Sequence, residues 1–265
     1  MQNVSSWFFP ETSITTLLKT RPMVMSIFEK YGINPWSYNF ESISQLCSLN
    51  QIPLDTFLVE FKSLSKPERH TEWKDQPIYF LIDFLSREHW HFLQRVLPAI
   101  KRSITEEKSE NVESLRRIGY LVQEWPKFSS ALQEHINEEE NFLFPKIIHY
   151  DYCYRNQKDH ADFLGGSVNV YVALKMLGKE TEQMAAIRRF LSEMLFSKAV
   201  LHGEDPLDDQ LTKQLKDFHE KLIAHSSLES EVLFPMAKAV EKAMMDNQIA
   251  GGFSITGKNK QSAHS

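Results

Sequence analysis

The sequence predicts an all-α protein, and three observations carry that prediction. Only nine of the 265 residues are glycine, about 3% against a usual share of roughly 7%. Long segments repeat apolar residues at intervals of three and four, as amphipathic helices do. No pair of alternating strands flanked by a hairpin turn is evident. Because β-rich chains use glycine in turns and bulges, we expect long helices in an up-down four-helix bundle.

Residues 1–65 are predicted to form a small helical domain. Pro22 begins one of its helices and Gly32 ends it, which is the order in which these two residue types usually flank a helix. Further short helices follow, each with its own apolar positions. Residues 66–76 are polar and are predicted to be a linker.

Residues 77–246 are predicted to form the bundle, because the helical pattern becomes much longer from residue 77 onward. The expected helices cover about 77–102, 110–148, 156–178, 181–201 and 207–245. Pro126 is expected either to break the second of these helices or to start a new one. Residues 247–265 are polar, contain two adjacent glycines, and are expected to be a flexible tail.

Composition and charge exclude several classes of function. The net charge of -5 gives no basic field for nucleic acid. The chain has no apolar run of about 18 residues and no basic, apolar N-terminal signal, so we expect a cytoplasmic protein without a membrane partner. Cys47 and Cys153 are too few for a disulfide framework, a four-cysteine zinc site or a typical iron–sulfur cluster. A metal site would therefore depend on histidine and carboxylate ligands.

A short internal repeat pairs a histidine with a glutamate on two different helices. Residues 135–145 and 225–235 both read His-x3-Glu-x3-Leu-Phe-Pro. Residues four apart lie on the same face of a helix, one turn from each other. Each copy therefore presents an imidazole and a carboxylate side by side, in line with an apolar Leu-Phe pair.

These two pairs, His135 with Glu139 and His225 with Glu229, predict a metal site inside the bundle. A charged glutamate is costly in an apolar core unless it is paired or binds a metal. Two imidazoles and two carboxylates suit iron, manganese or zinc, and bridging carboxylates suit a two-metal centre. The alternative is a hydrogen-bonded pair on each solvent face. One copy would favour that alternative, but two copies in the same register favour the metal site.

His89 and His160 are further candidate ligands. His160 lies on a third predicted helix, and a metal site in a bundle draws ligands from several helices. His89 lies on the apolar stripe of the first long helix, where ligation and an ordinary core histidine are equally supported. Trp90 and His91 are each rotated from that stripe by roughly 100° per residue. No phosphate-binding loop, nucleophile elbow or His-Glu-x-x-His motif is present.

With these motifs, residues from about 12 to 245 resemble the hemerythrin-like di-iron proteins of the repair-of-iron-centres family. The resemblance rests on the doubled motif, on His160 followed by small residues, and on the stretch from Thr20 to Ile33. It implies a small helical domain followed by a hemerythrin-like four-helix bundle with two non-haem irons. It also implies a stress-response role in repairing iron–sulfur clusters damaged by nitric oxide or oxidants.

Carried over by position, the resemblance implies iron ligation by five residues: His135, Glu139, His160, His225 and Glu229. The two glutamates would bridge the irons. Nitric oxide, dioxygen or peroxide would be the reactants. Iron–sulfur proteins and a second copy of the chain, in a homodimer, are the candidate protein partners.

Three departures from the family pattern affect this interpretation. Trp36 and Ser37 stand where the family has a Cys-Cys pair. A gapless alignment puts Trp90 at the ligand position of the first long helix, whereas the periodicity prefers His89. No histidine lies in residues 92–134, where the family has another ligand.

One iron therefore lacks at least one usual ligand. It would be open, weakly held or absent. Two alternatives to repair follow: a sensor of nitric oxide, oxygen or iron status, and a metal-poor helical interaction module.

Overall fold

The computed structural model describes residues 9–38, 40–64, 73–108, 112–157, 182–193 and 209–255. These residues form helices and their connections, and the only β-type pairing among them is an isolated bridge between Ser13 and Ser42. The prediction of an all-α protein is confirmed. Within the same ranges, every helix is too short or too polar to cross a membrane.

The N-terminal region contains short helices with well-defined ends. Those described are α1 (Ile14–Thr20), α2 (Met25–Lys30), α3 (Ile43–Leu49) and α4 (Leu54–Ser63). Ser13 caps α1, and Ser42 forms a capping box with Gln45 at the start of α3. Pro22 begins a 3₁₀ turn directly before α2. Gly32 follows α2 with a φ of +67°, a left-handed conformation that glycine adopts without strain.

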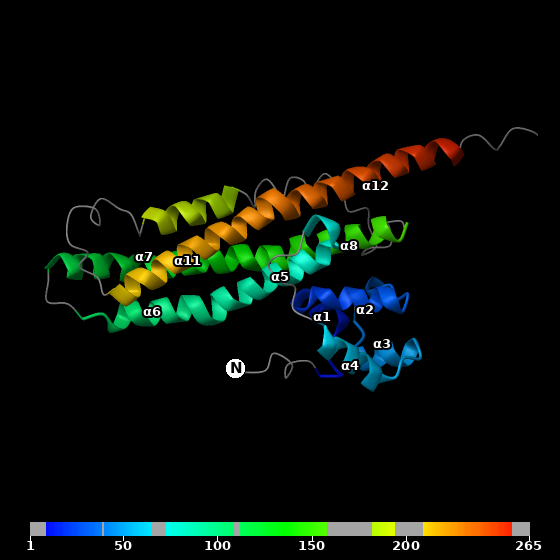
Figure 1. The fold of residues 1–265 in the computed structure, drawn as a ribbon, viewed down its shortest axis with the longest axis horizontal. Helices are drawn as coiled ribbons and strands as arrows, with labels where there is room; N and C mark the ends of the chain where they lie inside the picture. The colour runs from blue at the N-terminus through cyan, green and yellow to red at the C-terminus, as the bar shows by residue number, and fades with distance from the viewer. Residues whose placement is uncertain are drawn as a thin grey trace, which may run out of the picture.

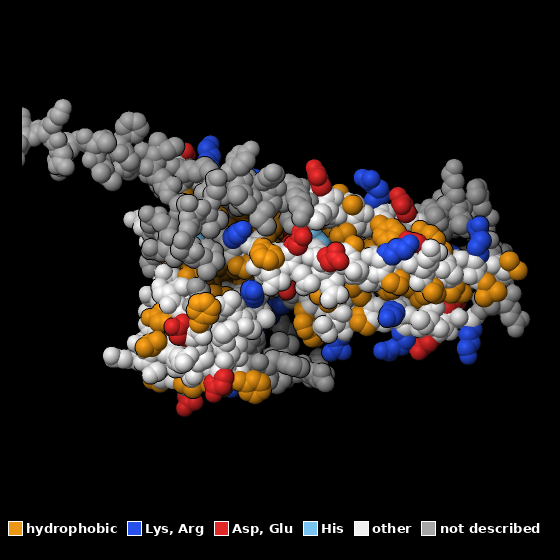
Figure 2. All heavy atoms as spheres, turned by 180° about the vertical axis from the view of Figure 1, so that it is seen from behind, with side chains coloured by type: hydrophobic (Ala, Val, Ile, Leu, Met, Phe, Trp, Pro, Cys, Tyr) orange, Lys and Arg blue, Asp and Glu red, His pale blue; other side chains and the backbone are white. Residues whose placement is uncertain are grey.

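Within the described residues, three long helical rods follow, together with a shorter helix over residues 182–193. The first rod is α5 (Ile78–His91), η5 (Phe92–Val96) and α6 (Leu97–Glu106); the second is α7 (Val112–Glu138), η6 (Glu139–Leu143) and α8 (Phe144–Arg155); the third is α11 (Asp209–Leu228), η8 (Glu229–Leu233) and α12 (Phe234–Ile255). The rods run alongside one another, and the small N-terminal helices pack at one end, beside α5 and α8 (Figure 1). Acidic and basic side chains are interspersed on the face shown in Figure 2.

Three helix boundaries differ from those predicted. Pro126 lies inside α7 without ending it. Pro126 and Val122, whose carbonyl loses its N–H partner, are both on the exposed face, where water can replace the missing donor, and Trp125 and Phe128 supply the buried face. Residues 247–255, predicted as part of a flexible tail, continue α12. The second rod runs on to Arg155 before the chain turns. Most of the helix predicted over 156–178 lies outside the described residues.

Each rod contains one π-helical turn (η5, η6 or η8), and a proline follows each turn at the same distance. The turns end two residues before a proline, namely Pro98, Pro145 and Pro235. A proline has no N–H, and its ring crowds the carbonyl four residues earlier. The residue before each proline instead donates to the carbonyl five residues back: Leu97 to Phe92, Phe144 to Glu139, and Phe234 to Glu229. The Leu-Phe-Pro end of the repeat therefore builds a wider turn at a fixed distance from the histidine.

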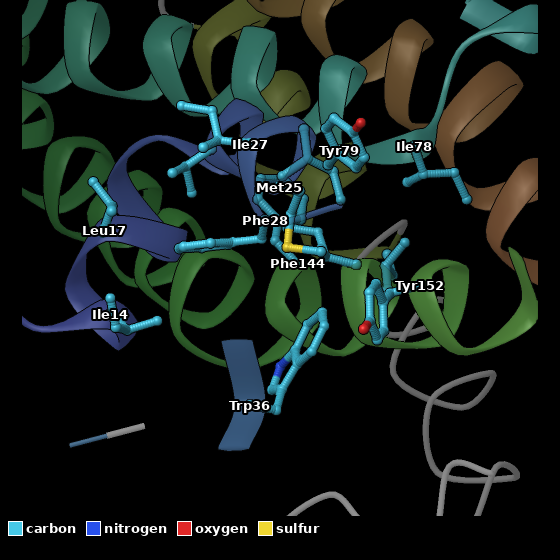
Figure 3. Close-up of a cluster of buried hydrophobic side chains, with 14 of the residues drawn as sticks. Ile14, Leu17, Met25, Ile27, Phe28, Trp36, Ile78, Tyr79, Phe144 and Tyr152 are labelled. Carbon is cyan, nitrogen blue, oxygen red and sulfur yellow. The ribbon is translucent and has the colours of Figure 1, made fainter. Parts of the chain in front are cut away.

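The buried apolar side chains form two clusters. The first, which we call the domain-side core, joins α1–α4 to α5, α8 and the beginning of α12. Figure 3 shows Phe28 and Trp36 of the small helices beside Tyr79 of α5 and Tyr152 of α8. The Trp36 ring centroid is 5.0 Å from that of Tyr152 and 4.7 Å from that of His149. The N-terminal helices therefore share one core with one end of the rods.

The second cluster, the distal core, fills the other end of the rods. Phe92, Phe128 and Phe218 meet there from the three rods, with ring centroids 5.5 and 5.9 Å from Phe218. Residues 182–193 complete it, because Leu191 is fully buried in the same cluster. The segment predicted as an additional helix over 181–201 is thus a core element in its described part.

A buried charge network joins the small helices to the first rod. Asp83 on α5 is completely buried and lies 2.6 Å from Arg87 and 3.6 Å from Arg21. Its Oδ1 atom also accepts a hydrogen bond of 3.3 Å from the backbone N–H of Met23. Removing one member of a buried charge network leaves the others uncompensated.

We expect Asp83→Ala to lower the free energy of unfolding by about 3 kcal/mol, because two guanidinium groups lose their shared carboxylate. Lys127→Ala is the matched control, since Lys127 forms an exposed ion pair with Glu124 on α7. It should cost less than about 1 kcal/mol. Urea denaturation measures both. Equal effects of the two substitutions would contradict the interpretation.

Glu241 on α12 gives a second, pH-dependent prediction. It is 4% exposed, and burial raises its pKa from 4.5 to about 7. The folded protein binds a proton on Glu241 more tightly than the unfolded chain does. The contribution of Glu241 to the free energy of unfolding is therefore most favourable below pH 4.5, and it is lost as the pH rises through 7. Glu241→Gln should raise the free energy of unfolding at pH 8 by about 1 kcal/mol once solvent screening is allowed for. Denaturation at pH 5 should show little change, and an equal effect at both pH values would contradict the prediction.

Candidate metal centre

Two histidine rings from different rods face each other between the two cores. His89 comes from α5 and His225 from α11, and each is 1% exposed. Their Nε2 atoms are 2.9 Å apart. His89 stacks on Phe144 with an interplanar angle of 7°, and His225 meets Phe92 edge-on. Apolar neighbours thus hold both rings with their Nε2 atoms directed at the same small space.

Glu139 and Glu229 bring two carboxylates to that space. Each is the first residue of a π-turn and follows the histidine of its repeat by four positions. Glu229 Oε1 lies 2.9 Å from His225 Nε2 and 3.9 Å from His89 Nε2, and Glu139 Oε2 lies 3.3 Å from His89 Nε2. One ligand atom from each of the four residues lies within 4.8 Å of all the others. We call His89, Glu139, His225 and Glu229 the inner cluster; it is a buried group that could hold a metal ion.

The distances and donor atoms of the inner cluster fit a metal ion. Two ligand atoms bound at about 2.1 Å and at right angles to each other lie about 3.0 Å apart, close to the shortest separations found. Both oxygens of Glu139 and Oε1 of Glu229 accept no hydrogen bond of good geometry from the described residues. Buried acceptors without donors are costly, and a cation would satisfy them. Imidazole nitrogen and carboxylate oxygen together suit a first-row divalent metal.

The charges of the inner cluster are strongly coupled. Burial raises the pKa of Glu139, and the charge of Glu229 raises it further. Burial would also raise the pKa of Glu229, but the positive charges of the surrounding histidines, His225 first, lower it overall. Burial opposes protonation of His225, yet Glu229 and Glu88 raise its pKa to about 10. The group therefore holds protons at neutral pH that a metal ion would replace.

Of the six residues predicted from the sequence, four form the inner cluster and a fifth lies beside it. His135 is 2% exposed, and its Nε2 atom is 3.5 Å from Oε1 of Glu139. The sixth, His160, lies outside the described residues. On the first rod, the side chain of His89 lies in the inner cluster, whereas Trp90 is 52% exposed and His91 is also exposed. Ligation by each of these residues stays a prediction.

Two carboxylates that the sequence motifs do not single out also contact the inner cluster. Glu88 Oε2 lies 2.9 Å from Nδ1 of His225, and Glu140 Oε1 lies 3.1 Å from Nδ1 of His89. The prolines offered a signal: Glu88 stands ten residues before Pro98, as the repeat histidines stand ten residues before theirs. The first rod therefore shares the register of the repeat, with Glu88 at the histidine position and Phe92 at the glutamate position. Because both motif residues differ, only the proline and the π-turn reveal the correspondence.

No other histidine of α7 replaces the ligand that the resemblance leads one to expect. From Leu121 to Leu132, the buried positions of α7 are occupied by apolar residues of the distal core. This part of the second rod therefore contributes apolar side chains to the distal core and no nitrogen ligand to the inner cluster.

No protein-family model and no curated protein matches the sequence. The interpretation of the site therefore rests on its own residues: two buried imidazoles, two buried carboxylates and the π-turns that position them.

Metal binding to the full chain should release protons. His225 carries a proton at neutral pH in the metal-free protein, because its pKa is raised to about 10. Each proton displaced makes the association constant for Co²⁺ rise about tenfold per pH unit between pH 6 and 8. Direct titration with Co²⁺ at three pH values, followed by absorbance, measures this slope. An association constant that is independent of pH would contradict the assignment of His225 to the metal.

Proposed function

We propose that this chain is a non-haem iron protein with a hemerythrin-like four-helix bundle that reacts with nitric oxide or oxygen species. The inner cluster is the observation that carries the proposal. We also propose that the protein acts in the response to nitrosative or oxidative stress and that its specific role is the repair of iron–sulfur clusters. The resemblance of the doubled motif to the repair-of-iron-centres family supports this role.

The ligand types support iron. Imidazole and carboxylate groups are the usual protein ligands of non-haem iron, whereas thiolates favour zinc, copper or clusters. Neither Cys47 nor Cys153 belongs to the inner cluster, although both are buried. Bound iron would supply one-electron redox chemistry and affinity for nitric oxide and dioxygen at positions that protein atoms leave open.

The two oxygens of Glu139 support a place for a second iron. Oε2 faces His89, while Oε1 faces His135 at 3.5 Å. One carboxylate thus stands between two imidazoles, as a bridging ligand would. His160 is proposed as a further ligand on the His135 side, from the family resemblance. The protein's own contribution is a dry, apolar surrounding, with Phe92 and Phe144 packed against the two rings of the inner cluster.

A sensor is the second candidate function, and one contact favours it. Lys19 of α1 donates a hydrogen bond of 3.1 Å to Asn141, which lies in η6 two residues after Glu139. The small helices also share the domain-side core with α8, which follows η6 directly. A change in the position of Glu139 would therefore reach the N-terminal helices through η6.

We expect the full chain, purified without chelator, to retain near-stoichiometric iron, and Glu139→Gln combined with Glu229→Gln to lose it. The glutamine variant keeps the side-chain volume but removes both buried charges that would hold the cation. Metal analysis measures the loss. After anaerobic Fe²⁺ addition, only the wild type should develop the visible absorption of an iron–nitrosyl species on exposure to nitric oxide.

The matched control combines Glu134→Gln with Glu231→Gln, because both residues are exposed, Glu134 directly before the first repeat and Glu231 within the second. It should retain iron and nitric oxide reactivity. A folded wild type that neither retains nor takes up iron would contradict the proposal and favour the metal-poor interaction module. Iron binding without nitric oxide or oxygen reactivity would contradict the reactive role.

A further inference from the structure

We infer that Glu88 and Glu140 are positioning residues, which hold His225 and His89 with Nε2 directed at the metal and thereby strengthen metal binding. This inference rests on the proposed function, since it assigns to two residues a role toward the same metal ion. Neither carboxylate belongs to the inner cluster, and both lie on the outer side of the histidine rings.

The first observation is that each histidine is held at both ring nitrogens. For His225, Nε2 faces Glu229 at 2.9 Å and Nδ1 faces Glu88 at 2.9 Å. For His89, Nε2 faces Glu139 at 3.3 Å and Nδ1 faces Glu140 at 3.1 Å. Each ring therefore has one inner and one outer carboxylate.

The second observation is the chemical type of the outer partners, which are both carboxyl groups. A carboxylate only accepts hydrogen bonds, so it favours the ring tautomer with the proton on Nδ1. In that tautomer the lone pair lies on Nε2, which is the atom that points into the inner cluster. A negative partner behind the ring also makes Nε2 a stronger metal ligand, as carboxylate–histidine pairs do in other metalloproteins.

The third observation is that each outer carboxylate crosses from one rod to another. Glu88 of the first rod holds His225 of the third, and Glu140 of the second rod holds His89 of the first. In the second rod, the adjacent π-turn residues Glu139 and Glu140 reach opposite nitrogens of the His89 ring. Glu88 and Glu140 are 23% and 31% exposed, so they reach the rings from the edge of the bundle.

The test uses Co²⁺ as the probe metal and the full chain in four forms: wild type, Glu88→Gln, Glu140→Gln and Glu134→Gln. Glu134 is the matched control, because it is an exposed glutamate directly before His135, as Glu88 is directly before His89. We expect the association constant for Co²⁺ to fall by about ten- to a hundredfold in each of the first two variants. The control should stay within about twofold of the wild type on the same scale.

Two further readouts separate positioning from a structural role. The visible ligand-field bands of the Co²⁺-saturated protein should shift in Glu88→Gln and Glu140→Gln, because a neutral partner changes the donor strength of the imidazole. The far-ultraviolet circular dichroism of the metal-free chain should match the wild type in both variants, since glutamine retains the size and an acceptor oxygen of the side chain.

Unchanged affinity and spectrum in both glutamine variants would overturn the inference while leaving the proposed function intact. An equal loss of affinity in Glu134→Gln would also overturn it, since the effect would then be one of general charge. Failure of the folded wild type to bind Co²⁺ or iron would instead overturn the proposed function itself.

Discussion

Two buried carboxylates at the centre of an apolar bundle are the constraint on which the rest of the structure depends. Removing an ionised carboxylate from water costs several kcal/mol unless a compensating charge is close by. Glu139 and Glu229 are 0% and 2% exposed, and the buried partners nearest to them are histidines. A cation between these four side chains would remove the cost, because it satisfies the carboxylates and the Nε2 lone pairs together.

This polar layer also organises the apolar packing. The domain-side core and the distal core lie on opposite sides of the inner cluster, and each supplies one of the rings that hold the histidines. Phe144 of the first core stacks on His89, and Phe92 of the second core meets His225. The N-terminal helices belong to the domain-side core through Trp36 and its neighbours. They are therefore part of the surroundings of the site and not an independent appendage.

The class of the fold and most of the inner cluster could be predicted from sequence, because both depend on local spacing. The His-x3-Glu interval of each repeat fixes one turn of helix, whatever the rest of the chain does. The position of His89 over Trp90 also followed from periodicity, which records the buried face of α5. The effect of Pro126 was harder to predict. The sequence alone does not distinguish a proline on the exposed face of a long helix from a proline at the end of one.

The outer carboxylates could not be found in this way, because their contacts join different rods. Glu88 and His225 are 137 positions apart, and Glu140 and His89 are 51 apart. Nothing local distinguishes Glu88 from the other glutamates of an amphipathic helix until the π-turns are aligned on their prolines. In that alignment, the position ten residues before the proline is a histidine in two rods and a glutamate in the third. Which charged side chains meet between different helices thus depends on how the helices pack. The periodicity of apolar residues along one helix does not carry that information.

X-ray absorption at the iron edge of the purified full chain is the most direct measurement of the central claim. The account predicts bound iron with only nitrogen and oxygen neighbours at about 2.0–2.2 Å, and with the outer-shell scattering typical of imidazole ligands. An edge without iron, or a sulfur shell at about 2.3 Å, would contradict it.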